Sequence, residues 1–237
     1  MSREKQRRNI SRRNLLKFGG GALGTGVLTA GLGAKFVFPE RAVAQNDMLP
    51  DQALRMLMEG NQRFVNGKSQ NPHQDLARLA EVAKAQKPFA AILSCADSRV
   101  PSEIIFDQGF GDLFVCRVAG NIATPEEVGS LEFGSLILGT KVIMVLGHKR
   151  CGAVAATIQG AQVPGQIASL LDAIKPALEK SENQPGDQLE NTCKANVLLQ
   201  VEKLKASPVI TQLIEAGKLN IVGGYYDLDT RKVTRLS

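Results

Sequence analysis

The chain lacks the compositional extremes of a disordered or fibrous protein. Of its 237 residues, 43% are hydrophobic and 22% are charged, as is ordinary for a globular domain. No internal repeat, low-complexity linker or second domain is visible. The length therefore fits one globular domain with a core of ordinary size and a short appendage.

Outside its first segment, the chain also lacks an excess of positive charge. The formal net charge is +6, from 29 Lys and Arg against 23 Asp and Glu. Nine of these basic residues but only two of the acidic ones fall within residues 1–44, so 20 basic and 21 acidic residues remain for the rest. A nearly neutral domain gives no electrostatic reason to expect nucleic acid or an anionic lipid surface as a partner.

Residues 1–44 resemble a twin-arginine signal peptide. A basic region contains Arg12 and Arg13, a Gly- and Ala-rich stretch follows, and Ala42-Val43-Ala44 supplies the small residues that a signal peptidase needs. The glycines make the stretch weakly hydrophobic and poorly helical, which argues against an uncleaved membrane anchor. We expect cleavage after Ala44, a mature domain over 45–237 without stable membrane insertion, and a periplasmic location, or the thylakoid lumen in a photosynthetic organism.

Hydrophobic periodicity predicts helices and strands in alternation. N-terminal helices are expected over about 49–86, before an α/β core over about 88–237. Short apolar runs predict buried strands, and helical spacing separates them. The strands are expected at 89–93, 113–118, 141–146, 219–226 and 232–236, and the later helices at 124–138, 166–180, 187–205 and 209–216, the first of these capped by Thr124. This order predicts a single α/β domain with a mostly parallel central sheet flanked by helices, which binds its ligand beyond the carboxyl ends of the strands.

Cysteine is scarce and no CxxC pair is present. The four cysteines are Cys95, Cys116, Cys151 and Cys193. In an oxidising compartment this even number is compatible with two disulfides. Cys116 falls within an expected strand and Cys193 within an expected helix, as packed thiols do, although a disulfide between them remains open.

The other two cysteines and one histidine follow expected strands. Cys95 ends the first strand, and His148 and Cys151 follow the third. Zinc prefers thiolate and neutral imidazole ligands, and three protein ligands leave its fourth position open to water. The spacing by itself leaves an oxidised or simply buried pair of thiols as the alternative.

Two segments resemble the signature segments of beta-class carbonic anhydrases. They are Cys95–Pro101, CADSRVP, and Gly147–Gly152, GHKRCG. Segments 114–121 and 129–133 between them also resemble family patterns, and the resemblance extends from about Leu49 to the C-terminus.

This resemblance implies the metal, the reaction and the assembly. Cys95, His148 and Cys151 would bind one Zn²⁺ per subunit, and zinc-bound hydroxide would reversibly hydrate carbon dioxide to bicarbonate and a proton. A homodimer or homotetramer is implied, with the active site at the subunit interface.

The resemblance also implies a catalytic dyad of Asp97 and Arg99. Asp97 would accept the hydrogen bond of the nucleophile, and Arg99 would keep Asp97 ionised and off the metal. If this pair breaks, Asp97 becomes a possible fourth zinc ligand in a closed state. Without the neighbouring ligands, the same Asp-Ser-Arg run would be read as a turn with a solvent-exposed salt bridge.

Substrate-binding roles are implied for Gln108 and Gly152. Gln108 aligns with a glutamine that reaches across the dimer interface toward the substrate, although its neighbours here depart from the common family pattern. Gly152 aligns with a glycine whose backbone amide lies beside the site. The chain has no tryptophan, and Ile92 stands where the bicarbonate-regulated subtype usually has one, which disfavours that subtype. His73 lies in a polar segment and is expected to be exposed, so no proton shuttle is identified.

Two other functions are compatible with the same residues. One is a hydrolase for carbonyl sulfide or carbon disulfide, since these linear molecules resemble carbon dioxide. The other is a non-catalytic scaffold that binds zinc or bicarbonate. The presence of Asp97 and Arg99 argues against the scaffold, because a structural zinc needs no oriented carboxylate beside an open position.

Overall fold

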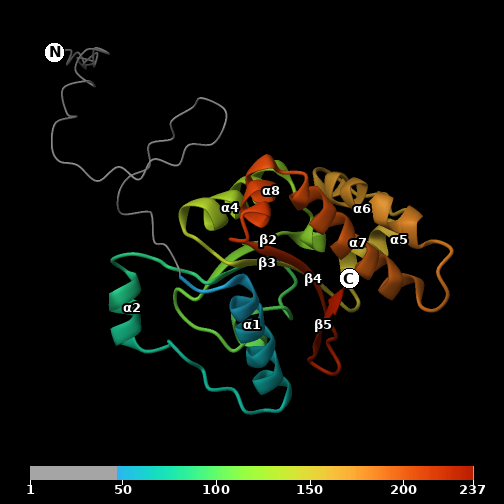
Figure 1. Ribbon diagram of the computed structural model, residues 1–237. Coiled ribbons are helices and arrows are strands. Elements are labelled where there is room, and N and C mark those ends of the chain that lie inside the picture. The colour runs from blue at the N-terminus through green and yellow to red at the C-terminus, as the bar shows by residue number, and fades with distance from the viewer. Residues whose placement is uncertain (1–46, 237) are drawn as a thin grey trace, which may run out of the picture. The chain divides into compact units, whose positions relative to one another are not determined.

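The computed structural model describes residues 47–236 (Figure 1). The expected export signal, with Arg12, Arg13 and the cleavage position after Ala44, lies outside the described residues. Among the helices of 47–236, none combines the length and the apolar character that crossing a bilayer requires.

A central sheet has the strand order β2-β1-β3-β4-β5. Its strands are β1 (Ala90–Ser94), β2 (Leu113–Arg117), β3 (Val142–His148), β4 (Asn220–Tyr226) and β5 (Val233–Leu236). The first four are parallel, and β5 pairs antiparallel with β4. All residues of β1 and β3 are buried, as expected of parallel strands that are covered on both faces. The predicted α/β sheet is confirmed.

Helices cover both faces of this sheet (Figure 1). The long helices are α1 (Pro50–Val65), α6 (Ile167–Ser181) and α7 (Gln188–Lys205), and the shorter ones are α2 (Leu76–Val82), α3 (Ser102–Ile105), α4 (Pro125–Glu132), α5 (Gly152–Ile158) and α8 (Pro208–Glu215). Successive strand residues point to opposite faces, so the core divides into groups. Ile92 packs in one group with Leu57 of α1, and the next residue, Leu93, packs in another with Val197 and Leu204 of α7.

The predicted helix over 124–138 has the predicted extent but differs in its interior and in its cap. The helix predicted over 124–138 is interrupted, because α4 gives way to a π-helical turn at Phe133–Ile137. Thr124 does not cap the helix through its side chain; its hydroxyl donates instead to the carboxylates of Glu126 and Glu127, which compete for it. Within the predicted helical region 49–86, the second helix starts at Leu76, because the carboxylate of Asp75 accepts the Arg78 N–H and caps it there.

A buried carboxylate fixes the segment that leads to Gln108. Asp107 has a φ of 49°, and its carboxylate accepts the backbone N–H groups of Gln70 and Asn71 and the Nε–H of Arg63, the last at 2.5 Å. Burial acts to raise the pKa of Asp107, but these hydrogen bonds outweigh it and lower the pKa. The C-terminal turn of α1 is thereby tied to the segment after α3.

Candidate metal centre

The three expected metal ligands meet where two neighbouring strands end. Cys95 directly follows β1, His148 is the last residue of β3, and Cys151 is the N-cap of α5. Because β1 and β3 are parallel and in direct register, with Ser94 opposite Leu146, their carboxyl ends lie at the same edge of the sheet. Cys95 is 53 positions from His148 in the sequence, and the pairing of β1 with β3 brings the two residues together.

The geometry of this cluster suits a zinc ion. The ligand atoms of Cys95, His148 and Cys151 all lie within 4.8 Å of one another, and all three residues are buried. Nδ1 of His148 donates to the Lys149 carbonyl oxygen at 2.9 Å, which leaves Nε2 with a free lone pair. Nε2 is buried and has no hydrogen-bond partner in the described structure. A buried nitrogen without a partner is costly, and a metal ion beside two sulfurs would satisfy it.

The two thiols are electrostatically coupled. A hydrogen bond from the Cys151 thiol lowers the pKa of Cys95 to about 4, against the opposing effect of burial. The same bond, together with burial, raises the pKa of Cys151, so the two thiols shift in opposite directions. A divalent cation favours the thiolate form of both sulfurs, as zinc binding requires.

Asp97 lies beside the cluster and forms an ion pair with Arg99. The guanidinium of Arg99 binds the carboxylate in bidentate fashion, with Nε to Oδ1 at 2.9 Å and Nη2 to Oδ2 at 2.7 Å, and the Arg99 backbone N–H adds a bond of 2.9 Å. These bonds hold the pKa of Asp97 well below its usual range. Oδ2 lies 3.8 Å from Nε2 of His148. The predicted pairing of Asp97 with Arg99 is thus present, next to the orphaned imidazole nitrogen.

Arg117 contacts the site, although no sequence motif indicates a separate role for it. It ends β2, and its guanidinium donates to two backbone carbonyls, that of Cys95 at 3.1 Å and that of Asp97 at 2.6 Å. Arg117 therefore fixes the loop that carries Cys95 and Asp97. Its position at the carboxyl end of a strand next to β1 is the signal that would have identified it.

The loop between His148 and Cys151 is anchored on its outer side. Arg150 has a φ of 56°, and its guanidinium binds both carboxylate oxygens of Asp229, at 2.9 and 2.7 Å. Lys149 also pairs with Asp229, at 3.0 Å. Sequence patterns had not identified Asp229, because it follows β4 and lies about 80 positions from the loop that it holds.

Three further residues were singled out in the sequence, namely Gly152, Gln108 and His73. Gly152 begins α5, and a Cβ placed there would meet nothing within 4 Å, so the space around it is open. Gln108 is buried, and its amide donates to the Phe106 carbonyl at 2.9 Å, within its own turn. His73 is half-exposed and pairs with Asp112 at 2.8 Å.

The other two cysteines are free thiols in different core groups. Cys116 packs on the side of the sheet that α7 and α8 cover, whereas Cys193 lies in the group that contains Cys95 and Cys151. Burial raises the pKa of Cys193 to about 12, so it remains a neutral thiol. Both are packed thiols, as predicted, and no disulfide joins them in the structure.

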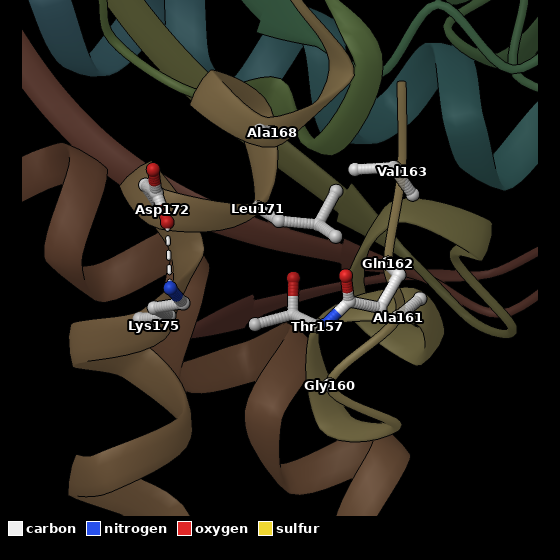
Figure 2. A pocket seen from close by; sticks show the side chains of 9 residues that line it. All are labelled: Thr157, Gly160, Ala161, Gln162, Val163, Ala168, Leu171, Asp172 and Lys175. Carbon is white, nitrogen blue, oxygen red and sulfur yellow. Dashed lines mark hydrogen bonds and ion pairs between the residues drawn. The ribbon is translucent and has the colours of Figure 1, made fainter. Parts of the chain in front are cut away.

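A hollow of about 300 Å³ is lined by α5, by the loop that follows it and by α6 (Figure 2). Figure 2 shows Asp172 and Lys175 on its wall, paired with each other at 2.6 Å. They are the only charged residues in its lining, and none of the ligand cluster contributes to it. The chemistry therefore belongs to the sheet edge, where the buried ligands meet.

Comparisons with known proteins agree with this geometry. The carbonic anhydrase family model matches residues 90–233. Carbonic anhydrase 2 of Mycobacterium tuberculosis is 39% identical over 185 residues, which are 76% of this chain and 89% of that protein. The carbonic anhydrase of Mycolicibacterium smegmatis is 36% identical over 189 residues, covering 78% and 92% of the two chains.

Solved structures share the fold. The beta-carbonic anhydrase of Coccomyxa, solved in complex with acetazolamide, has a TM-score of 0.61 and 26% identity, and covers 77% of this chain and 86% of its own. A beta-carbonic anhydrase of Sordaria macrospora superposes with a TM-score of 0.63 at 24% identity, covering 78% of this chain and 96% of its own.

Proposed function

The chain belongs to the beta-class carbonic anhydrase family, and from this premise we propose that its Cys-His-Cys centre holds one zinc ion and hydrates carbon dioxide to bicarbonate and a proton. One observation carries the proposal. The orphaned Nε2 of His148 is buried beside two thiols, and a carboxylate held by an arginine stands 3.8 Å away. This combination fits a catalytic zinc with one open position better than a structural site with four protein ligands.

Different residues would bind the metal and orient the nucleophile. Cys95, His148 and Cys151 would hold the zinc, which when bound supplies a Lewis acid that brings the ionisation of water toward neutral pH. Asp97 accepts the hydrogen bond of the solvent nucleophile and so aims the lone pair of its oxygen at the carbon of CO2. The new carbon–oxygen bond converts carbon dioxide and water into bicarbonate, and the proton passes to the buffer.

Arg99 keeps Asp97 in the form that this role needs. An ionised carboxylate only accepts hydrogen bonds, whereas a protonated one would compete as a donor. The bidentate bond also occupies both carboxylate oxygens, which restrains Asp97 from joining the metal as a fourth ligand. The same bond is the reason to prefer catalysis over a zinc-binding scaffold, because a closed structural site gains nothing from it.

Removal of the metal tests the proposed function. We expect the purified chain to contain one zinc per subunit and to accelerate CO2 hydration in a stopped-flow assay with a pH indicator. A strong chelator should abolish the acceleration, and added zinc should restore it, since the ligand set has no catalytic substitute for the ion. Hydration that survives complete zinc removal would contradict the proposal.

An assay with carbonyl sulfide distinguishes a carbonyl sulfide hydrolase from a carbonic anhydrase. The same preparation is supplied with carbonyl sulfide, and release of hydrogen sulfide is measured. Faster turnover of carbonyl sulfide than of carbon dioxide would replace the proposed substrate while leaving the zinc centre in place.

An assembly of two or four subunits is part of the proposal. Apolar side chains remain exposed on the N-terminal half of the chain, as they do on surfaces that another subunit covers. They include Leu76 (82% exposed), Ile104 (58%) and Phe110 (44%). Gln108 precedes Phe110 by two positions; in this subunit it is buried and its amide donates to the Phe106 carbonyl, so a role for it in a second subunit's site is proposed from the family resemblance alone.

Export is proposed from the first 44 residues alone. The domain boundary at Ala44 and the periplasmic or lumenal location both depend on the Arg12-Arg13 pair and the small residues at 42 and 44. A signal of this kind sends a folded protein across the membrane, so that zinc would be bound before export.

Substitution of the arginine pair tests the export proposal. Residues 1–46 are fused to a folded fluorescent reporter, and Arg12 and Arg13 are both changed to Lys, which preserves charge. We expect the unchanged fusion to be exported and the R12K/R13K fusion to stay in the cytoplasm, as measured by fractionation. Changing Arg7 and Arg8 to Lys is the matched control and should leave export intact, whereas equal export of all three fusions would contradict the twin-arginine assignment.

A further inference from the structure

Two fully buried amides on α7 form a chain of hydrogen bonds toward the metal centre. Nδ2 of Asn196 donates to the Gly120 carbonyl oxygen at 2.8 Å, and Nε2 of Gln200 donates to Oδ1 of Asn196 at 2.8 Å. Oε1 of Gln200 accepts the Ala123 N–H at 2.9 Å. A carbonyl at one end and an N–H at the other fix the orientation of both amides.

Gly120 connects this chain to a metal ligand. Its backbone N–H donates to the Sγ of Cys95 at 3.3 Å. Its φ is +77°, a conformation that favours glycine, and a Cβ there would come within 2.7 Å of Cδ1 of Ile174, so that the end of this side chain would have to shift. Asn196 therefore holds the carbonyl side of a residue whose N–H side faces the ligand sulfur.

The burial of these amides calls for an explanation beyond packing. Asn196 and Gln200 have no exposed surface and lie in a helix whose neighbouring core residues, Val197 and Leu204, are apolar. Burying an amide costs free energy unless its hydrogen bonds are made, and an apolar side chain would fill the same space without that cost. Apart from their mutual bond, both amides bond to the backbone of residues 120–123, the segment that contacts Cys95.

We propose that Asn196, supported by Gln200, is a positioning residue for the metal centre that holds the Gly120 N–H against the sulfur of Cys95. A hydrogen bond to a thiolate withdraws electron density from the sulfur and fixes its direction, so it sets how strongly the sulfur donates to a metal. The inference rests on the proposed function, because it concerns a sulfur that holds zinc.

Cobalt substitution tests the inference through a signal that stability alone does not change. The full chain is loaded with Co²⁺ in place of zinc, and the thiolate-to-cobalt charge-transfer band is recorded for the unaltered chain and for Asn196→Leu. Loss of the N–H···S bond makes the sulfur more electron-rich, so we expect the band to move to longer wavelength. We also expect zinc affinity, measured by chelator competition, to fall by roughly tenfold, as is typical when a partner of a metal ligand is lost.

Two further variants make the result decisive. Gln200 is one hydrogen bond further from the sulfur than Asn196. Gln200→Leu should therefore shift the band in the same direction by less. Thr140→Val removes a buried hydroxyl that bonds to Ser135 at 3.2 Å, near the opposite end of β3, and should lower stability without moving the band. If Asn196→Leu does not fold, the band of Gln200→Leu decides.

The outcomes separate the inference from the proposed function. A band and an affinity that match those of Thr140→Val would overturn the positioning role and leave the zinc enzyme intact. Absence of any thiolate charge-transfer band in the unaltered chain would instead overturn the proposed function, and this inference with it.

Discussion

Asn in place of Asp97 is expected to lower kcat/KM for CO2 hydration by about 100-fold or more, while zinc content stays near one per chain. The amide has nearly the shape of the carboxylate but carries no charge, and its NH2 group donates hydrogen bonds where the nucleophile needs an acceptor. Arg99 would lose its ionic partner at the same time. The measurements are stopped-flow hydration and elemental analysis of the same preparation.

A matched control removes one carboxylate charge elsewhere. Asp172 pairs with Lys175 on the exposed face of α6, at 2.6 Å, and takes no part in the proposed centre. Asp172→Asn should keep full activity, since exposed pairs of this kind contribute little. Unreduced kcat/KM in Asp97→Asn would remove the role given to this carboxylate, whereas parallel loss of zinc would show that Asp97 supports the metal site instead.

Replacement of Cys151 by Ser should have the largest effect on the metal itself. Serine has the same shape but is a poor zinc ligand, and it leaves only Cys95 and His148 in the cluster. We expect zinc affinity to fall by more than about 100-fold, which exceeds the usual cost of losing an outer partner of a ligand. Hydration activity should disappear with the zinc, as measured by chelator competition and stopped-flow kinetics.

Cys116 provides the control for this substitution. It is a free, half-buried thiol in β2, in a different core group from the cluster. Cys116→Ser should retain zinc and activity. If Cys151→Ser keeps one tightly bound zinc per chain, Cys151 is not a ligand and the proposed centre is wrong.

Much of the sheet could be predicted because its signals are local. Short apolar runs at β1 and β3 indicated strands that are buried on both faces, and the alternation with helices indicated parallel pairing. Parallel strands present their carboxyl ends at one edge, so the sequence predicts Cys95 and His148 at the same edge of the sheet, and the pairing of β1 with β3 brings them together. The failures were also local, as at Thr124, where two carboxylates compete for the hydroxyl that would have capped the helix.

The kinds of side chain in the proposed centre, their placement after apolar strands and the spacing of Asp97 and Arg99 can be read from the sequence, because each depends on residues that are close along the chain. The groups that support these residues come from distant parts of the chain and are known only from the fold. Arg117 reaches the Cys95 loop because β2 lies beside β1, and Asn196 reaches Gly120, 76 positions away, because α7 packs across the sheet. Such contacts depend on how whole elements pack together, and no periodicity or spacing within one segment encodes them.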